Sequence, residues 1–301
     1  MFEIASDKLV YALSQNHAPV ARVTNGETVV FHTCDCFQNQ ITHEEQEFGT
    51  LDWERINPAT GPLFIEGADP GDTLAVEILS IDVAEQGVMT TGPNLGVLGD
   101  ELAENVIRMV PIRDGVAHFS SSLRIPLSPM IGVIGTAPAG ADVSCGTPGD
   151  HGGNMDCTKI RAGATLLLPV NVPGALLAMG DLHAAMADGE VAVCGIEIAG
   201  KVTVRLHVIK GKTWKLPMLI DAEHVIAIAS EERLDEAAER ATKNMVDFLE
   251  GSCGMERAEA VLLLSAAGSL RICQVVDPKK TARMELPRVY AEQLGFSFAN
   301  A

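Results

Sequence analysis

The sequence predicts a mostly β protein, with a β sandwich-like or barrel-like main part and a smaller C-terminal α+β part. Short alternating or β-branched runs, separated by turn signals, fill the chain up to about residue 220. No helical spacing persists there for more than two turns, whereas an amphipathic helical pattern begins near residue 230. We therefore expect a β-rich domain over residues 1–221 and an α+β part over residues 222–301 that packs on it.

The strands of the main part are predicted from short apolar runs that are bounded by turn residues. The clearest runs are 28–31 (TVVF), 73–78 (TLAVEI) and 201–206 (KVTVRL), which fit half-buried strands. Turns are expected at 25–26 (NG) and at 69–72 (DPGD), because proline fixes φ and glycine accepts positive φ. Many short strands at this spacing are typical of a sandwich or barrel.

The C-terminal part begins with a predicted amphipathic helix. Apolar residues recur at helical spacing from Leu234 to Leu249, and charged residues lie on the opposite face. Ser230 is the expected N-cap, and Gly251 is the residue at which the helix is expected to stop. The elements that should follow are a helix over 255–267, a strand over 270–276 and a short helix over 287–294.

The charge balance excludes two classes of partner. The chain has 22 Lys and Arg against 40 Asp and Glu, a net charge of −18, and both nucleic acid and anionic membranes attract basic proteins. No apolar run approaches the roughly 20 residues of a membrane span, and no signal peptide pattern is visible. Seven cysteines without a CxxC pair indicate neither a disulfide framework nor a zinc finger. We therefore expect a cytoplasmic protein.

Three segments gather polar residues among glycines and apolar residues, and the first of them, 31–40 (FHTCDCFQNQ), follows a predicted strand directly. If the strand continues, His32, Cys34 and Cys36 share one face and Asp35 takes the other. The two cysteines fit small buried residues. Asp35 lies within an apolar run, so its carboxylate needs a hydrogen-bonding partner or a metal ion.

The second segment, 144–159 (SCGTPGDHGGNMDCTK), combines glycines with titratable side chains. Glycines let the backbone approach a ligand closely and leave amide groups free to point at it. His151, Asp156 and Lys159 supply a base, a metal ligand and a cation in one short stretch. A polar surface loop is the simpler interpretation, but the strongly apolar flanks weaken it.

The third segment, 180–190 (GDLHAAMADGE), is followed by Glu197 in the next apolar run. Asp181 and His183 are two residues apart, so in extended backbone their side chains point to one side. Glu197 can complete a mixed nitrogen and oxygen site with an open position, which suits zinc and also other divalent ions. The simpler alternative is that Glu197 faces solvent between two buried isoleucines.

These ordered stretches resemble the acetamidase/formamidase family over nearly the whole chain. The resemblance is carried by FHTCDCFQNQI (31–41), NPATGPLFIEGADPGDTL (57–74), IGTAPAG (134–140), HGGNMDCTKI (151–160) and LLLPVNVPGALLAMGDLHAAMADGE (167–190). It implies a mostly β fold with a smaller α+β part, and hydrolysis of a short amide such as formamide or acetamide to ammonia and a carboxylate. A Glu often stands in that family where His32 stands here, which puts a role for His32 in doubt.

Amide hydrolysis requires a polarised carbonyl oxygen, an activated water and a protonated leaving nitrogen. A divalent metal ion can supply the first two functions, and a Glu or His can move the proton. Our hypothesis places such an ion, zinc in the first instance, among the three polar segments. Glu197 is then the proton shuttle, and His151 binds the substrate or assists the transfer. The hypothetical metal ligands are Asp35, Asp156, Asp181 and His183.

Two alternatives to this hypothesis stay open at the level of sequence. Cys157 lies close to Lys159 and could be the nucleophile of an amidase, because a nearby cation lowers the pKa of a thiol. The chain could also be a non-catalytic binding protein of the same fold, although the Asp, His and Glu residues in all three segments speak against it. The charge-poor stretch 166–179 suggests buried contacts between subunits or domains, although packing of the C-terminal part explains it equally, and we expect a homo-oligomer.

Overall fold

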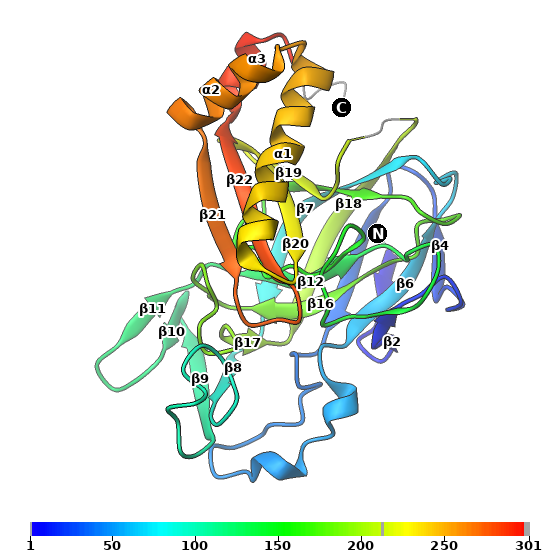
Figure 1. The fold of residues 1–301 in the computed structure, drawn as a ribbon. Helices are drawn as coiled ribbons and strands as arrows, with labels where there is room; N and C mark the ends of the chain where they lie inside the picture. The colour runs from blue at the N-terminus through cyan, green and yellow to red at the C-terminus, as the bar shows by residue number, and fades with distance from the viewer. Residues whose placement is uncertain (1, 212–213, 298–301) are drawn as a thin grey trace.

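The computed structural model describes residues 2–211 and 214–297, and it confirms the mostly β fold class. Two large sheets dominate the molecule (Figure 1). In spatial order, the nine-stranded sheet contains β1 (Phe2–Ile4), β5 (Thr28–Thr33), β18 (Gly200–Ile209), β7 (Thr73–Val83), β15 (Thr165–Pro169), β19 (Met218–Ile220), β20 (His224–Glu231), β22 (Lys280–Pro287) and β21 (Ser269–Gln274).

The eleven-stranded sheet carries most of the candidate site. Its main path runs through β11 (Arg124–Pro126), β10 (Val116–His118), β9 (Val106–Arg113), β8 (Gln86–Thr91), β17 (Glu197–Ile198), β16 (Leu177–His183), β12 (Met130–Gly135) and β14 (Gly152–Asn154). The remaining strands join through β6 (Ala59–Ile65), which pairs with β16, β2 (Leu9–Val10) and β4 (Ala21–Val23). A separate small pair consists of β3 (Ala12–Leu13) and β13 (Val143–Ser144).

The main hydrophobic core lies between the two sheets. Phe31, Val76 and Val204 from the nine-stranded sheet belong to the same buried cluster as Leu63 and Ile131 from the other sheet. All five side chains are completely buried. Burial of the two apolar faces against each other is what holds a β sandwich together, and it gives the site a rigid base.

The helices follow the predicted order and cover the C-terminal strands of the nine-stranded sheet (Figure 1). They are α1 (Leu234–Cys253), α2 (Arg257–Ala267) and α3 (Arg288–Gln293). The apolar stripe of α1, which includes Met245 and Leu249, packs with Val225 and Leu286 in a second core cluster. The amphipathic pattern is therefore confirmed as the face that buries α1 against the sheet.

Both predicted ends of α1 need correction. Ser230 lies at the end of β20, where its hydroxyl is 2.9 Å from that of Thr281, and the N-cap is Arg233. Gly251 is inside the helix, which ends at Gly254. Of these two glycines, only Gly254 adopts a left-handed backbone, with a φ of 66°. Its amide donates a hydrogen bond to the carbonyl of residue 250, so Gly254 terminates the helix.

The strand β22 was not predicted because charged residues interrupt its pattern. Arg283 lies in the middle of this buried strand, and its guanidinium donates to the carboxylates of Glu285 and Asp188, each at 2.7 Å. The predicted strand over 270–276 is found as β21. The expected division at residue 221 falls between β19 and β20, which are neighbours in one sheet.

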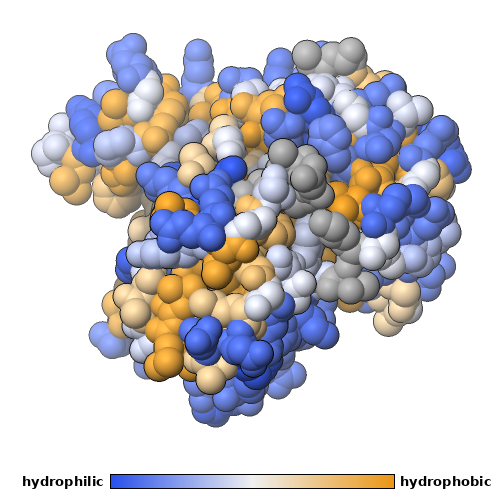
Figure 2. Space-filling model, turned by 90° about the horizontal axis from the view of Figure 1, so that it is seen from above, coloured by the Kyte–Doolittle hydropathy of each residue, from blue (hydrophilic) through white to orange (hydrophobic). Residues whose placement is uncertain are grey.

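The surface carries the acidic surplus of the chain. Figure 2 shows hydrophilic side chains over much of one face, with hydrophobic patches between them. Within the described residues, no helix has the length and the apolar character that a membrane crossing requires. A net charge far from zero favours solubility.

We predict that Phe31→Ala lowers the free energy of unfolding by about 3–5 kcal/mol, because it opens a cavity between the two sheets. Phe2→Ala is the matched control. Phe2 lies on the adjacent strand β1 and is 43% exposed, so its loss should change stability by about 0.5 kcal/mol or less. Urea denaturation of both variants measures the difference, and equal losses would contradict the proposed core.

Candidate functional site

A group of buried titratable side chains lies where β16 and β17 run side by side. His183 and Glu197 are direct partners in this antiparallel pair, so their side chains leave the same face of the sheet. Nε2 of His183 is 3.0 Å from Oε1 of Glu197. Asp181 reaches the same place, with its Oδ1 3.6 Å from Nε2. The prediction that Asp181 and His183 point to one side is confirmed.

Two further carboxylates approach His183 from loops. Asp156 follows β14 and places its Oδ1 3.7 Å from Nε2 of His183, while Glu190 lies after β16 and places its Oε1 3.9 Å away. Asp156 and His183 have no exposed surface, and Asp181, Glu190 and Glu197 are also buried. Four acids therefore surround one imidazole inside the protein, and we call these five residues the His183 cluster.

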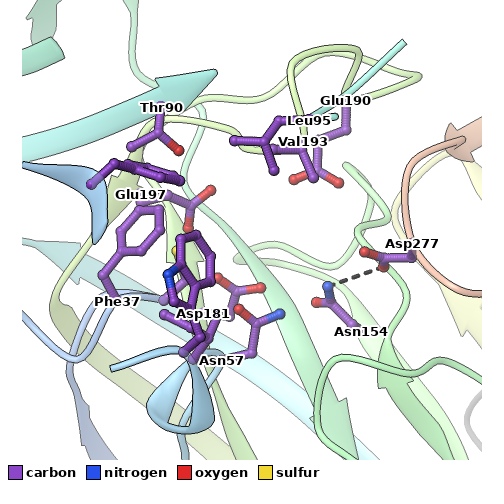
Figure 3. A pocket seen from close by; sticks show the side chains of 14 residues that line it. Phe37, Asn57, Thr90, Leu95, Asn154, Asp181, Glu190, Val193, Glu197 and Asp277 are labelled. Carbon is purple, nitrogen blue, oxygen red and sulfur yellow. Dashed lines mark hydrogen bonds between the residues drawn. The ribbon is translucent and has the colours of Figure 1, made fainter. Parts of the chain in front are cut away.

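The His183 cluster opens into a cavity of about 140 Å³ (Figure 3). Asp181, Glu190 and Glu197 line this cavity directly, and Asn154 donates a hydrogen bond to Asp277 across it at 3.0 Å. Cys36, Asn57 and Thr90 add further polar groups. The apolar part of the wall consists of Phe37, Phe48, Trp53, Ile56, Leu95 and Val193.

The segment that supplies most of the apolar wall lies between β5 and β6. It contains two short 3-10 helices, η1 (Phe48–Thr50) and η2 (Trp53–Arg55), and runs along the bottom of the view in Figure 1. The rings of Phe48 and Trp53 pack with centroids 4.9 Å apart. Trp53 is 48% exposed, which places an aromatic ring at the mouth of the cavity.

The backbone is strained at several residues of this site. Asp156, Asp181 and Glu190 have left-handed φ values of 42°, 54° and 48°. Val193 has a φ of 78°, a region that a β-branched residue rarely adopts. Such conformations cost about 1–3 kcal/mol each, and they persist only where the surrounding structure enforces them. Their concentration around one cavity is typical of a functional site.

Two glycines leave room for the His183 cluster. A Cβ atom at Gly132 would lie 2.5 Å from Oδ1 of Asp156 and 2.6 Å from Oδ2 of Asp181. A Cβ atom at Gly195 would lie 2.6 Å from Nδ1 of His183. The Gly195 amide also donates to Oε1 of Glu197 at 2.8 Å. A side chain at either position would displace the buried charges.

Burial and mutual repulsion raise the pKa values of Asp156, Glu190 and Glu197. Burial is the largest cause for Asp156, and the charges on Asp277 and Asp181 raise its pKa further. Burial also raises the pKa of Glu197 to about 7, against the opposing effect of His183. Burial by itself lowers the pKa of His183, but the charges on Glu197 and Asp181 outweigh it and raise the pKa well above the ordinary value. Additional positive charge would therefore stabilise this site.

Several atoms of the cluster have no hydrogen-bond partner within the described part of the chain. They are both carboxylate oxygens of Asp156, Oδ1 of Asp181, Oε2 of Glu197 and both ring nitrogens of His183. Buried polar atoms are almost always hydrogen-bonded, and buried charges are paired or coordinate a metal. A set of imidazole and carboxylate ligands that lacks partners fits a divalent cation.

The spacing of the ligand atoms also fits a cation. Asp156, His183 and Glu190 each offer an atom within 4.8 Å of the others. Nitrogen and oxygen donors of this kind bind zinc and several other divalent ions. Three protein ligands with a fourth position left open are typical of catalytic zinc sites.

Asp35 does not join the cluster, although sequence analysis placed it among the ligands. Its Oδ1 accepts hydrogen bonds from the amides of Phe37 at 3.0 Å and Asn39 at 2.6 Å. These bonds stabilise a turn that takes the chain out of the sheet after Thr33, so the predicted continuation of the strand through Cys36 is wrong. Burial raises the pKa of Asp35 to about 6.

The turn at Asp35 separates the other polar residues of the first segment. Cys36 lines the cavity, whereas His32 stays on β5 and pairs with Glu3 at the surface, with Nε2 2.7 Å from Oε2. Cys34 is buried, and its thiol donates to the carbonyl of Ser6. Only Cys36 of these residues faces the His183 cluster.

His151 and Cys157 lie away from the cavity that the cluster lines. His151 borders a different cavity, together with Arg240 and Lys279, and burial lowers its pKa to about 4. Cys157 is completely buried in the main core. Nζ of Lys159 is 3.9 Å from Asp221, so this cation has an acidic partner of its own.

Three residues that border the cavity were not identified from the sequence as potential metal ligands. Glu190 ends the third polar segment, and its position after an Asp-Gly turn is the only signal that it offers. Cys36 was interpreted as an ordinary buried residue, and Asp277 lies in a turn without a motif. All three reach the site through loop conformations, which the periodicity of a sequence does not encode.

Comparisons with family models and with solved structures point to the same family. A model of the family described as the Acetamidase/Formamidase family matches residues 14–146 and 141–290. The chain is 49% identical to an acetamidase of Bacillus halodurans, and the two structures superpose with a TM-score of 0.96 over 98% of this chain and 100% of that one.

Two curated relatives are more distant. The chain is 29% identical over 263 residues to a Schizosaccharomyces pombe protein provisionally named a formamidase, and 23% identical over 250 residues to a formamidase of Methylophilus methylotrophus. The matches cover 65% and 64% of this chain. They span 63% and 61% of the relatives, which is less than two thirds of their length.

We predict that Gly132→Ala weakens zinc binding by about 10–100-fold, because the new methyl group displaces the carboxylates of Asp156 and Asp181. Gly251→Ala is the control, since a Cβ atom at that helical position meets nothing within 4 Å. Isothermal titration of both metal-free variants gives the affinities. An unchanged affinity in Gly132→Ala would show that the carboxylate of Asp156 does not bind the ion.

Proposed function

Because the chain belongs to the acetamidase/formamidase family, we propose that it hydrolyses a short-chain amide, such as formamide or acetamide, to ammonia and a carboxylate. The observation that carries this proposal is the His183 cluster, in which buried acids without partners line a small cavity. The names of its relatives support the same substrate class.

We place one divalent ion, zinc in the first instance, on Asp156, His183 and Glu190. When bound, such an ion polarises a carbonyl oxygen and lowers the pKa of water towards about 7. These three residues replace the ligand set expected from the sequence. Asp35 is left out because its carboxylate already holds a turn together, and Asp181 is left out because its ligand atom groups with those of Cys36 and Glu197.

Glu197 is the residue that moves the proton in this proposal. Its Oε1 is fixed by the amide of Gly195, while its Oε2 has no partner within the described residues and its side chain lines the cavity. A pKa of about 7 suits a group that first accepts a proton and then returns it. Glu197 takes the proton of the water that attacks the carbonyl carbon, and delivers it to nitrogen as the C–N bond breaks.

The remaining walls orient the amide. Asn57, Thr90 and Asn154 can hydrogen-bond the amide group at the polar side of the cavity. Phe37 and Trp53 offer apolar surface to the acyl carbons. A volume of about 140 Å³ suits a small substrate. His151 borders a different cavity, so we assign it no contact with the amide.

The first test is ammonia release from formamide and acetamide by the purified protein. Glu197→Gln should lower kcat by about 10²–10⁴-fold, because an amide cannot accept the proton. Glu77→Gln is the control, since this exposed residue on β7 pairs with Arg205 away from the cavity. Full activity in Glu197→Gln would show that Glu197 is not the proton shuttle.

The same assay decides between the cluster and a cysteine nucleophile. Cys157→Ala should keep kcat within a few-fold of the wild-type value, because Cys157 is completely buried in the main core. Loss of activity in Cys157→Ala, with Glu197→Gln active, would favour the cysteine nucleophile over the His183 cluster. No ammonia from any amide in a panel of short substrates would favour a binding protein.

Metal removal is the second test. Prolonged chelation should abolish ammonia release, and zinc should restore it. Zinc at 100 times its Kd should also stabilise the metal-free protein by about 2.7 kcal/mol. In His183→Gln the stabilisation should be lost, because the central ligand of the cluster is missing. Full activity after complete metal removal would contradict a metal mechanism.

A further inference from the structure

We infer that the cavity binds a second divalent cation, on Cys36, Asp181 and Glu197, next to the ion on the His183 side. The inference rests on the proposed function for the position of the first ion. Each of the three residues offers a ligand atom within 4.8 Å of the other two, and all three are buried. None of them belongs to the set formed by Asp156, His183 and Glu190.

The charge of the site is the first argument. The carboxylates around the cavity and the cluster number five: Asp156, Asp181, Glu190, Glu197 and Asp277. One divalent ion leaves three of these charges without compensation when all five groups are ionised. Buried charges without a partner are costly, so the site must either bind a further cation or take up protons. A count of bound metal ions distinguishes these two outcomes.

Free ligand atoms are the second argument. Oδ1 of Asp181 and Oε2 of Glu197 have no hydrogen-bond partner among the described residues, although both side chains are at least nine-tenths buried. Neither atom belongs to the three residues on which we place the first ion. With Oε2 of Glu197 on the ion, the proton is carried on Oε1, which also accepts from the Gly195 amide at 2.8 Å.

The third argument is that the fold holds Cys36 in place. Cys36 lies within the turn that Asp35 caps, and the carbonyl of Cys36 accepts a hydrogen bond from the amide of Asn57 at 2.7 Å. A thiol together with two carboxylates suits zinc or cobalt better than magnesium or calcium, which prefer oxygen ligands alone.

The two ligand sets are direct neighbours. Nε2 of His183, from the first set, lies 3.0 Å from Glu197 and 3.6 Å from Asp181, which belong to the second. Paired metal ions in hydrolases act on the same reacting group from two sides. The arrangement therefore places both ions where a single amide can meet them.

Cobalt titration of the metal-free protein tests this inference. We expect two cobalt ions per chain by mass spectrometric metal analysis after dialysis. We also expect a sulfur-to-cobalt charge-transfer band in the near ultraviolet, because Cys36 would bind as a thiolate. Cys36→Ser should lose the band and bind one ion, while the visible absorption of the first ion stays.

The matched control is Cys34→Ser. Cys34 is also buried and lies two residues away, but its thiol donates to the carbonyl of Ser6. This variant should keep both ions and the band. Asp181→Asn is a second test that does not change the thiol. Asn tolerates the left-handed backbone of this position, so the variant should fold and bind one ion.

Three results would overturn the inference, and they separate it from the proposed function. One cobalt ion per chain without the charge-transfer band refutes the second site and leaves the metal amidase standing. A band that survives in Cys36→Ser refutes Cys36 as the ligand. Absence of any bound cobalt at saturating concentration refutes the second ion and the metal mechanism together, whereas ammonia release tests the amidase activity independently.

Discussion

The burial of several negative charges around His183 is the constraint on which the rest of the site depends. Asp156, Asp181, Glu190 and Glu197 approach one imidazole ring, and a single positive charge cannot compensate four negative ones. Like charges in a low-dielectric interior repel strongly, and burial together with this repulsion raises the pKa values of Asp156, Glu190 and Glu197. A bound cation removes the repulsion and also supplies the chemistry that amide hydrolysis requires.

The packed core of the fold holds the His183 cluster in place despite the strained backbone at the site. The sandwich core anchors β12, β16 and β17, while the unfavourable backbone conformations gather at the site, in loops at Asp156 and Glu190 and within β16 at Asp181. Gly132 and Gly195 provide the space into which the charged side chains fit. A rigid core can fix a site in a geometry that its residues alone would not adopt.

The sequence predicted the elements better than the connections between them. Periodic patterns revealed the β-rich main part and α1, because each pattern follows from a buried face. Asp181 and His183 converge as expected, although Asp181 has a left-handed φ of 54° and not the extended backbone from which the expectation was drawn. Asp35 and His151 were not brought together with them, because a side-chain cap and a loop redirect the chain there, and periodicity carries no information about either.

Anomalous diffraction from crystals grown with zinc shows whether the His183 cluster holds a metal ion. We expect a peak at the zinc absorption edge in contact with Nε2 of His183 and with carboxylate oxygens of Asp156 and Glu190. A well-ordered cluster without an anomalous peak, with its acids hydrogen-bonded to one another through shared protons, would contradict it.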